Sequence, residues 1–150
     1  MPETSPLEEV TGAQVLVRRT VAWHETDAAG HNHFAAAFRW LEEAEHRLYR
    51  CLDFDPALIE RIPRVHIEVD YRDRLYFGQV IDVMVGVIAV GRSSCTFAFG
   101  VRTASGDLAV EGRYVIVHAA STSDGAAPWP DALRSALGAP SAHVVDLVGP

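Results

Sequence analysis

The chain has 150 residues, 49% of them apolar and 22% charged, which suits one soluble globular domain. Its formal net charge of −7 argues against general binding to nucleic acid. All 13 basic residues are arginine, so Schiff-base chemistry on a lysine and a Walker-type phosphate loop are both excluded. No apolar run approaches the roughly 20 residues that span a membrane, and the first residues lack a secretory signal, so we expect a cytoplasmic protein.

The first part of the chain predicts a strand that runs into a long helix. Residues 1–12 are polar and carry two prolines, and we expect a flexible lead-in there, followed by a domain over residues 13–120. Residues 14–23 read as a strand. A glycine turn follows, and residues 35–52 then show helical spacing. The apolar stripe of this helix contains Phe34, Phe38, Leu41, Leu48 and Leu52.

The outer face of the same helix is charged. Glu43 and Arg47 stand four residues apart and are expected to form an ion pair. Glu45 falls near the centre of the apolar stripe, where a carboxylate needs partners or must become neutral. We expect Glu45 to face a subunit boundary or a substrate cavity.

The second half of the chain changes to the period of strands. Residues 65–71 alternate apolar and polar side chains, which predicts a half-buried strand. Three more strands, over 80–90, 95–103 and 108–118, are joined by short turns that favour antiparallel pairing. Residues 121–150 are expected to form a tail, with a short helix over 131–137. This order predicts an α+β fold of five antiparallel strands around one long helix.

The stretch that joins the first strand to the helix carries the candidate chemistry. Asp27 stands just before Gly30 and the helix N-terminus, where unpaired N–H groups and a partial positive charge can hold an anion. A carboxylate beside such a site is typical of a hydrolytic centre, in which one group activates water and another holds the developing oxyanion. The alternative is that Asp27 only forms the turn or caps the helix.

The residues around Asp27 have several possible roles. His31 or His33 can orient Asp27, line a substrate channel or make ordinary loop contacts. Asn32 can position water or a carbonyl group, or cap the helix. A metal site is not expected, because the chain has no second pair of metal ligands at a typical spacing.

These residues resemble the hotdog-fold thioesterases, in particular the 4-hydroxybenzoyl-CoA thioesterase branch. The resemblance covers roughly residues 14–118 and rests on three blocks: residues 26–31 with Asp27 and Gly30, residues 38–44 of the helix, and residues 63–78. It implies hydrolysis of an acyl-CoA or acyl-carrier-protein thioester without a metal or nucleotide cofactor. It also implies a homodimer or homotetramer whose sheets join edge to edge, with active sites between subunits.

The same resemblance assigns roles to particular residues. It makes Asp27 the nucleophile or general base, and a backbone N–H near Phe34 the oxyanion donor. Because some members of the family use a carboxylate within the helix, Glu42 is a further candidate. Gly30, His31 and Phe38 are expected to bind the substrate.

Other side chains complete the expected site or stand outside it. Arg64, Arg74 and Arg92 lie at strand ends and turns, where they can hold phosphates of the substrate or remain solvated. The two cysteines, Cys51 and Cys95, are expected to be buried thiols rather than nucleophiles. Two other functions stay open: a non-catalytic protein that binds acyl thioesters, and a hotdog hydratase or dehydratase.

Overall fold

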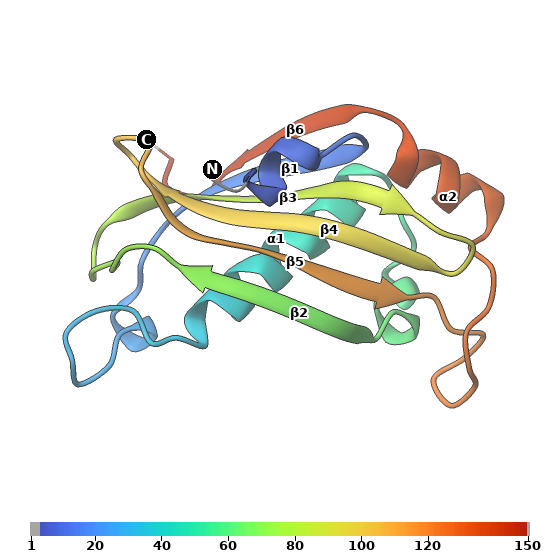
Figure 1. Ribbon diagram of the computed structural model, residues 1–150, viewed down its shortest axis with the longest axis horizontal. Coiled ribbons are helices and arrows are strands. Elements are labelled where there is room, and N and C mark those ends of the chain that lie inside the picture. The colour runs from blue at the N-terminus through green and yellow to red at the C-terminus, as the bar shows by residue number, and fades with distance from the viewer. Residues whose placement is uncertain (1–3, 150) are drawn as a thin grey trace.

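The computed structural model describes residues 4–149 and consists of one sheet with a long helix across one face (Figure 1). The strands are β1 (Ala13–Thr20), β2 (Arg64–Tyr71), β3 (Val80–Val90), β4 (Ser94–Thr103), β5 (Leu108–Val117) and β6 (Ser141–Asp146). The helices are α1 (Ala36–Cys51) and α2 (Asp131–Gly138), with 3-10 turns η1 (Pro6–Glu9), η2 (Trp23–Glu25) and η3 (Pro56–Arg61). Residues 1–3 of the expected lead-in lie outside the described residues.

The strand order in the sheet is β2-β5-β4-β3-β1-β6. Strands β3, β4 and β5 form an antiparallel meander, as their short turns predict, and β1 and β2 join its two sides antiparallel to β3 and β5. The predicted α+β architecture around one helix is confirmed. The sheet has six strands rather than five, because β6 pairs parallel with β1. The segment after residue 120 therefore contributes α2 and a strand.

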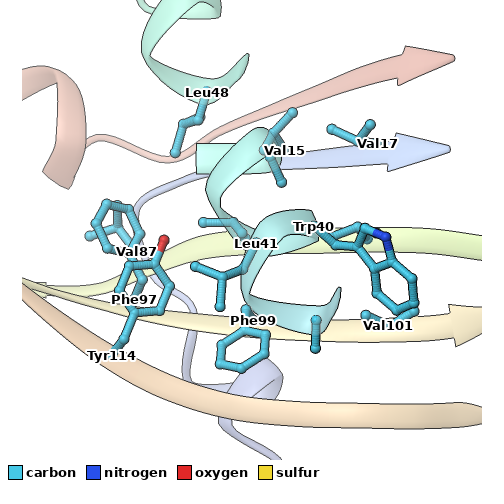
Figure 2. Close-up of a cluster of buried hydrophobic side chains, with 14 of the residues drawn as sticks. Val15, Val17, Trp40, Leu41, Leu48, Val87, Phe97, Phe99, Val101 and Tyr114 are labelled. Carbon is cyan, nitrogen blue, oxygen red and sulfur yellow. The ribbon is translucent and has the colours of Figure 1, made fainter. Parts of the chain in front are cut away.

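The core lies between α1 and the concave side of the sheet. Figure 2 shows Trp40, Leu41 and Leu48 of α1 directed toward strand residues that include Phe97 and Phe99. All five of these side chains are essentially inaccessible to solvent. A residue every three to four positions along α1 thus packs on the sheet, as helical periodicity requires.

Two expectations about burial are wrong. The strand over residues 65–71 exists as β2, but most of its residues are exposed: Val65 has 59% and Ile67 38% of its surface accessible. Cys95 is buried, whereas Cys51 at the end of α1 is exposed. Helix α1 packs mainly over β1 and β3, so the apolar side chains of β2 are left largely uncovered.

The helices of residues 4–149 include none long and apolar enough to cross a membrane.

Candidate active site

A loop between η2 and α1 carries the candidate catalytic residues. It projects beyond the end of the sheet, beside the C-terminal end of β2 (Figure 1). The loop closes on itself through an isolated antiparallel bridge between Thr26 and Asn32. Just outside this bridge, the N–H of His33 donates to the carbonyl of Glu25 at 2.8 Å. The hairpin-like closure places Asp27 on one limb and the chain leading to Phe34 on the other.

Asp27 forms a tight turn at the start of the loop. Its Oδ1 accepts the N–H of Ala29 at 2.9 Å, and its carbonyl accepts the N–H of Gly30 at 3.0 Å. Gly30 has a φ of +88°, a conformation that side chains with a Cβ rarely adopt. The carboxylate therefore does make the turn, but its Oδ2 has no hydrogen-bond partner within residues 4–149 and the side chain is exposed. One oxygen of Asp27 stays available for chemistry.

Asn32 anchors the loop to the body of the protein. Asn32 is 5% exposed, and its side-chain Oδ1 accepts the N–H of Leu75 at 3.0 Å. The backbone N–H of Asn32 donates to the carbonyl of Leu75 at 2.7 Å. The interpretation of Asn32 as a helix cap is wrong, because the N-cap residue of α1 is Ala35. His31 is half-buried, and its Nδ1 lies 3.2 Å from the carbonyl oxygen of Asn32.

His33 and Phe34 form the entry to α1. The Nδ1 of His33 accepts the N–H of Ala35 at 3.1 Å, and the imidazole stacks on the ring of Phe34 with centroids 4.6 Å apart. The carbonyl of Phe34 accepts a hydrogen bond from the hydroxyl of Tyr71 on β2. Its N–H has no acceptor among the described residues. This unpaired amide stands at a helix N-terminus, where developing negative charge is stabilised.

A small groove lies along α1 and β2. It has a volume of about 190 Å³ and is lined by Phe38, Leu41, Glu42, Arg64 and Ile67. Phe38, in the first turn of α1, is the lining residue nearest in sequence to Phe34. Its apolar lining and charged end suit an acyl group.

The charged end of the groove is organised by Arg64. Its Nη2 lies 2.9 Å from Oε1 of the buried Glu45, and its Nη1 lies 3.6 Å from Oε2 of Glu42. Glu45 also accepts the hydroxyl of Tyr49 at 2.7 Å. The hydroxyl of Tyr114 is buried nearby without a hydrogen-bond partner in the described part of the chain, and burial raises its pKa. Glu45 is thus a buried partner of Arg64, and the ion pair of Glu42 is with Arg64 rather than with the loop.

The other two arginines lie at opposite ends of the sheet. Arg74 is exposed and directly precedes Leu75, the partner of Asn32, so it lies beside the loop. Arg92 follows the far end of β3, whose first residue, Val80, pairs with Thr20 near the loop. A single chain therefore does not bring Arg92 to the site.

Two residues at this site are absent from the set predicted from the sequence. Glu25 is a buried carboxylate two residues before Asp27, and Tyr71 reaches Phe34 from a strand 37 positions away. The indole N–H of Trp40 was the one available hint for Glu25, because a buried indole needs an acceptor. Among residues 4–149, no three His, Cys, Asp or Glu side chains are grouped to hold a metal ion.

Comparison with known proteins gives a consistent family. The model of the thioesterase-like superfamily matches residues 21–137. A 1,4-dihydroxy-2-naphthoyl-CoA hydrolase of Prochlorococcus marinus (strain NATL2A) is 30% identical over an alignment of 97 residues that covers 57% of this chain. The match spans 63% of the length of that relative.

Solved structures show the same fold. A predicted thioesterase from Bacillus stearothermophilus superposes with a TM-score of 0.76 at 27% identity, covering 83% of this chain and 94% of that one. A 1,4-dihydroxy-2-naphthoyl-CoA thioesterase from Synechocystis gives a TM-score of 0.75 at 19% identity, covering 83% and 95%. Together with the matched family model, these likenesses show that the chain belongs to the thioesterase-like superfamily and has the hotdog fold of its thioesterases.

Proposed function

We propose that this protein hydrolyses an acyl-CoA thioester to the free acid and the thiol. The observation that carries the proposal is the pair of groups on the two limbs of the loop: the free Oδ2 of Asp27 and the unpaired N–H of Phe34. A carboxylate that activates or replaces water and an amide that holds an oxyanion are the two groups that acyl transfer to water needs.

In the general-base route, Asp27 accepts a proton from a water molecule as the water oxygen attacks the thioester carbonyl carbon. The negative charge that develops on the carbonyl oxygen is held by the N–H of Phe34, assisted by the start of α1. Collapse of the intermediate breaks the C–S bond, and the proton on Asp27 goes to the departing thiolate.

In the nucleophilic route, Oδ2 of Asp27 attacks the carbonyl carbon and expels the thiolate, leaving a mixed anhydride that water then hydrolyses. The two routes differ in the fate of the carboxylate oxygens. Turnover in H₂¹⁸O, followed by mass spectrometry of the peptide that contains Asp27, identifies the nucleophilic route if ¹⁸O appears in that peptide.

The groove along α1 and β2 is the proposed site of the acyl group. Phe38, Leu41 and Ile67 supply its apolar wall. Because the curated relative acts on 1,4-dihydroxy-2-naphthoyl-CoA, a hydroxylated aryl-CoA is the first substrate to assay, and carrier-protein esters come second. Arg74, beside the loop, is proposed to bind phosphates of the thiol moiety.

The active protein is proposed to be an oligomer joined through β2. Strands β2 and β6 are the two edges of the sheet, and β2, the edge beside the loop, exposes the side chains of Val65, Ile67 and Tyr71. An exposed apolar edge strand is a template for pairing with a second copy. If two copies of β2 pair antiparallel, the end of the partner's sheet that carries residue 92 lies at the same end as this loop.

The test is thiol release from a panel of aryl-, short-chain and long-chain acyl-CoAs. Asp27→Asn is expected to lower kcat by about 10²-fold or more, as removal of a general base does. Asp55→Asn is a matched control, because Oδ1 of Asp55 accepts the N–H of Ala57 at 2.9 Å in the same turn geometry that Asp27 uses. Asp55→Asn is expected to keep wild-type turnover. Near-wild-type activity of Asp27→Asn would remove Asp27 from the reaction.

A further inference from the structure

Glu25 is a buried carboxylate in a loop whose other acidic residue is exposed. Only 6% of its surface is accessible, although it stands two residues before Asp27. A carboxylate taken out of water needs several hydrogen bonds to offset its lost hydration. The donors that Glu25 receives come from three different segments of the chain.

The first donor is Arg19, the penultimate residue of β1. Its Nη2 lies 2.8 Å from Oε1 and 2.9 Å from Oε2 of Glu25. Trp40 of α1 donates its indole N–H to Oε2 at 2.7 Å, and the backbone N–H of Ala22 donates to Oε1 at 2.8 Å. Glu25 therefore connects the end of β1, the turn η2 and the first half of α1 through one side chain.

The guanidinium of Arg19 is itself held in place. It also lies 3.2 Å from Glu43 and stacks over the ring of Trp40 at 5.8 Å from the centroid. Trp40 is completely buried under the sheet. The carboxylate is thus attached to a strand and to a buried side chain of the core rather than to other loop residues.

The backbone of Glu25 completes the arrangement. Its carbonyl accepts the N–H of His33 at 2.8 Å, which is the hydrogen bond that closes the loop from outside the Thr26–Asn32 bridge. Asp27 follows Glu25 by two residues on one limb, and Phe34 follows His33 by one residue on the other. The positions of the Asp27 carboxylate and the Phe34 amide therefore both depend on Glu25.

We propose that Glu25, held by Arg19 and Trp40, is the positioning residue that sets the Asp27 carboxylate and the Phe34 amide at their catalytic separation. The inference rests on the proposed thioesterase function. Glu25 does not touch the substrate; it acts through the loop. A displacement of about 1 Å between reacting groups can cost as much as 10²-fold in rate, so loosening this anchor is expected to lower kcat far more than it raises KM.

The test uses Glu25→Gln in the full chain, with Arg19→Lys as a second variant. Gln retains the size of the side chain but presents an amide to the arginine, whereas Lys retains the charge of Arg19 but has no second nitrogen to contact Glu43 while the first contacts Glu25. Each variant is expected to lose about 10- to 100-fold in kcat, with KM within threefold of wild type. The control is Glu111→Gln, which alters another buried carboxylate, bonded to Ser5 beside η1 and to Arg72.

A second readout needs no substrate. Amide hydrogen exchange by NMR is expected to accelerate at least tenfold for the N–H groups of Asp27 and His33 in Glu25→Gln and in Arg19→Lys. The N–H of Thr103, which bonds to the carbonyl of Asp107 in the β4–β5 turn, is expected to stay unchanged. Arg19→Lys keeps the test decisive if Glu25→Gln does not fold.

The outcomes separate the two proposals. If the wild type hydrolyses no acyl thioester, the function fails and the exchange rates alone decide whether Glu25 holds the loop. Wild-type kcat in a folded Glu25→Gln would overturn the positioning role. A kcat loss no larger than that of Glu111→Gln, or a loss without faster exchange at Asp27 and His33, would overturn it as well.

Discussion

At the scale of single residues, the candidate site depends on backbone conformation as much as on side chains. Gly30 adopts φ +88° in the turn that Asp27 makes, and a Cβ added there would meet no other atom. The cost of Gly30→Ala is therefore conformational, about 1–2 kcal/mol for a side chain forced into the left-handed region. We expect this variant to lose turnover, because the turn is what aims the free oxygen of Asp27.

Gly106 provides the matched control for Gly30. It has φ +91° in the β4–β5 turn and equally open surroundings, so Gly106→Ala is expected to lose similar stability. Denaturant unfolding and acyl-CoA turnover should be measured for both variants. Equal losses of activity in the two would mean that strain, not the position of Asp27, limits the rate.

The Phe34 amide is testable separately from the Phe34 ring. Phe34→Ala removes the exposed ring but keeps the N–H, whereas Phe34→Pro removes both. The carbonyl of His33 accepts the N–H of Ala36 at 2.9 Å, so Phe34 is the second residue of a turn, a position where proline is favoured. If this N–H holds the oxyanion, kcat of the proline variant falls about 10²–10³-fold below that of the alanine variant. Similar kcat values in the two variants, both folded by circular dichroism, would assign the oxyanion to another donor.

The two cysteines differ in reactivity for a physical reason that only the fold supplies. Cys95 is completely buried, and burial raises the pKa of its thiol well above the ordinary value, so it stays protonated at pH 8. Cys51 is exposed at the end of α1. We expect a disulfide thiol reagent to label one thiol in the native protein and two in guanidinium. Rapid labelling of both thiols in the native state would contradict the burial of Cys95.

At the scale of elements, Arg64 connects β2 to α1. Its ion pair with Glu45 compensates for the burial of this side chain, which is only 1% exposed. Arg64→Ala would leave Glu45 with the Tyr49 hydroxyl as its remaining donor, and is expected to lower the free energy of unfolding by about 1–3 kcal/mol.

Arg74→Ala is the comparison for Arg64→Ala. The side chain of Arg74 is exposed and has no ion pair among the described residues, so its removal should change stability by less than about 0.5 kcal/mol. Urea unfolding at neutral pH measures both variants. A loss for Arg64→Ala as small as that for Arg74→Ala would show that Glu45 finds other compensation.

The elements themselves were largely predictable from periodicity. The long helix and the strands that became β2 to β5 were predicted within a few residues, because period 3.6 and period 2 are local properties of the chain. Partners were not predictable. The ion pair of Glu43 is with Arg19 of β1 rather than with Arg47, and Trp40, absent from the predicted stripe, is a centre of the core.

Only those parts of the candidate site that lie close together in the sequence were predictable. Asp27 was predicted from its place before the glycine turn and the helix, and Phe34 from the resemblance to hotdog thioesterases; both stay predictions. Glu25 contacts Trp40, and Tyr71 contacts Phe34. These contacts join distant positions, so no spacing in the sequence indicates them. In the same way, β6 was expected to be tail because its pairing with β1 depends on the whole sheet.

At the scale of the whole molecule, the two edges of the sheet differ. Strand β6 closes the side of β1, and its Val144 is 74% exposed. On the opposite side, β2 exposes Val65, Ile67 and Tyr71. The hydroxyl of Tyr71 donates to the carbonyl of Phe34, just before α1. The candidate site therefore lies beside the β2 edge, where a second copy would cover it.

The proposed dimer through β2 makes a prediction about one substitution. If two copies of β2 pair antiparallel about the middle of the strand, Ile67 lies near its own counterpart, and Ile67→Arg places like charges opposite each other. We expect this variant to be monomeric by light scattering at concentrations where the wild type is a dimer, and to lose turnover in parallel. Val144→Arg adds the same charge to an exposed residue of the other edge strand and should leave the assembly intact. Dissociation by Val144→Arg and not by Ile67→Arg would place the interface at β6, and the open edge of β2 would then need another partner.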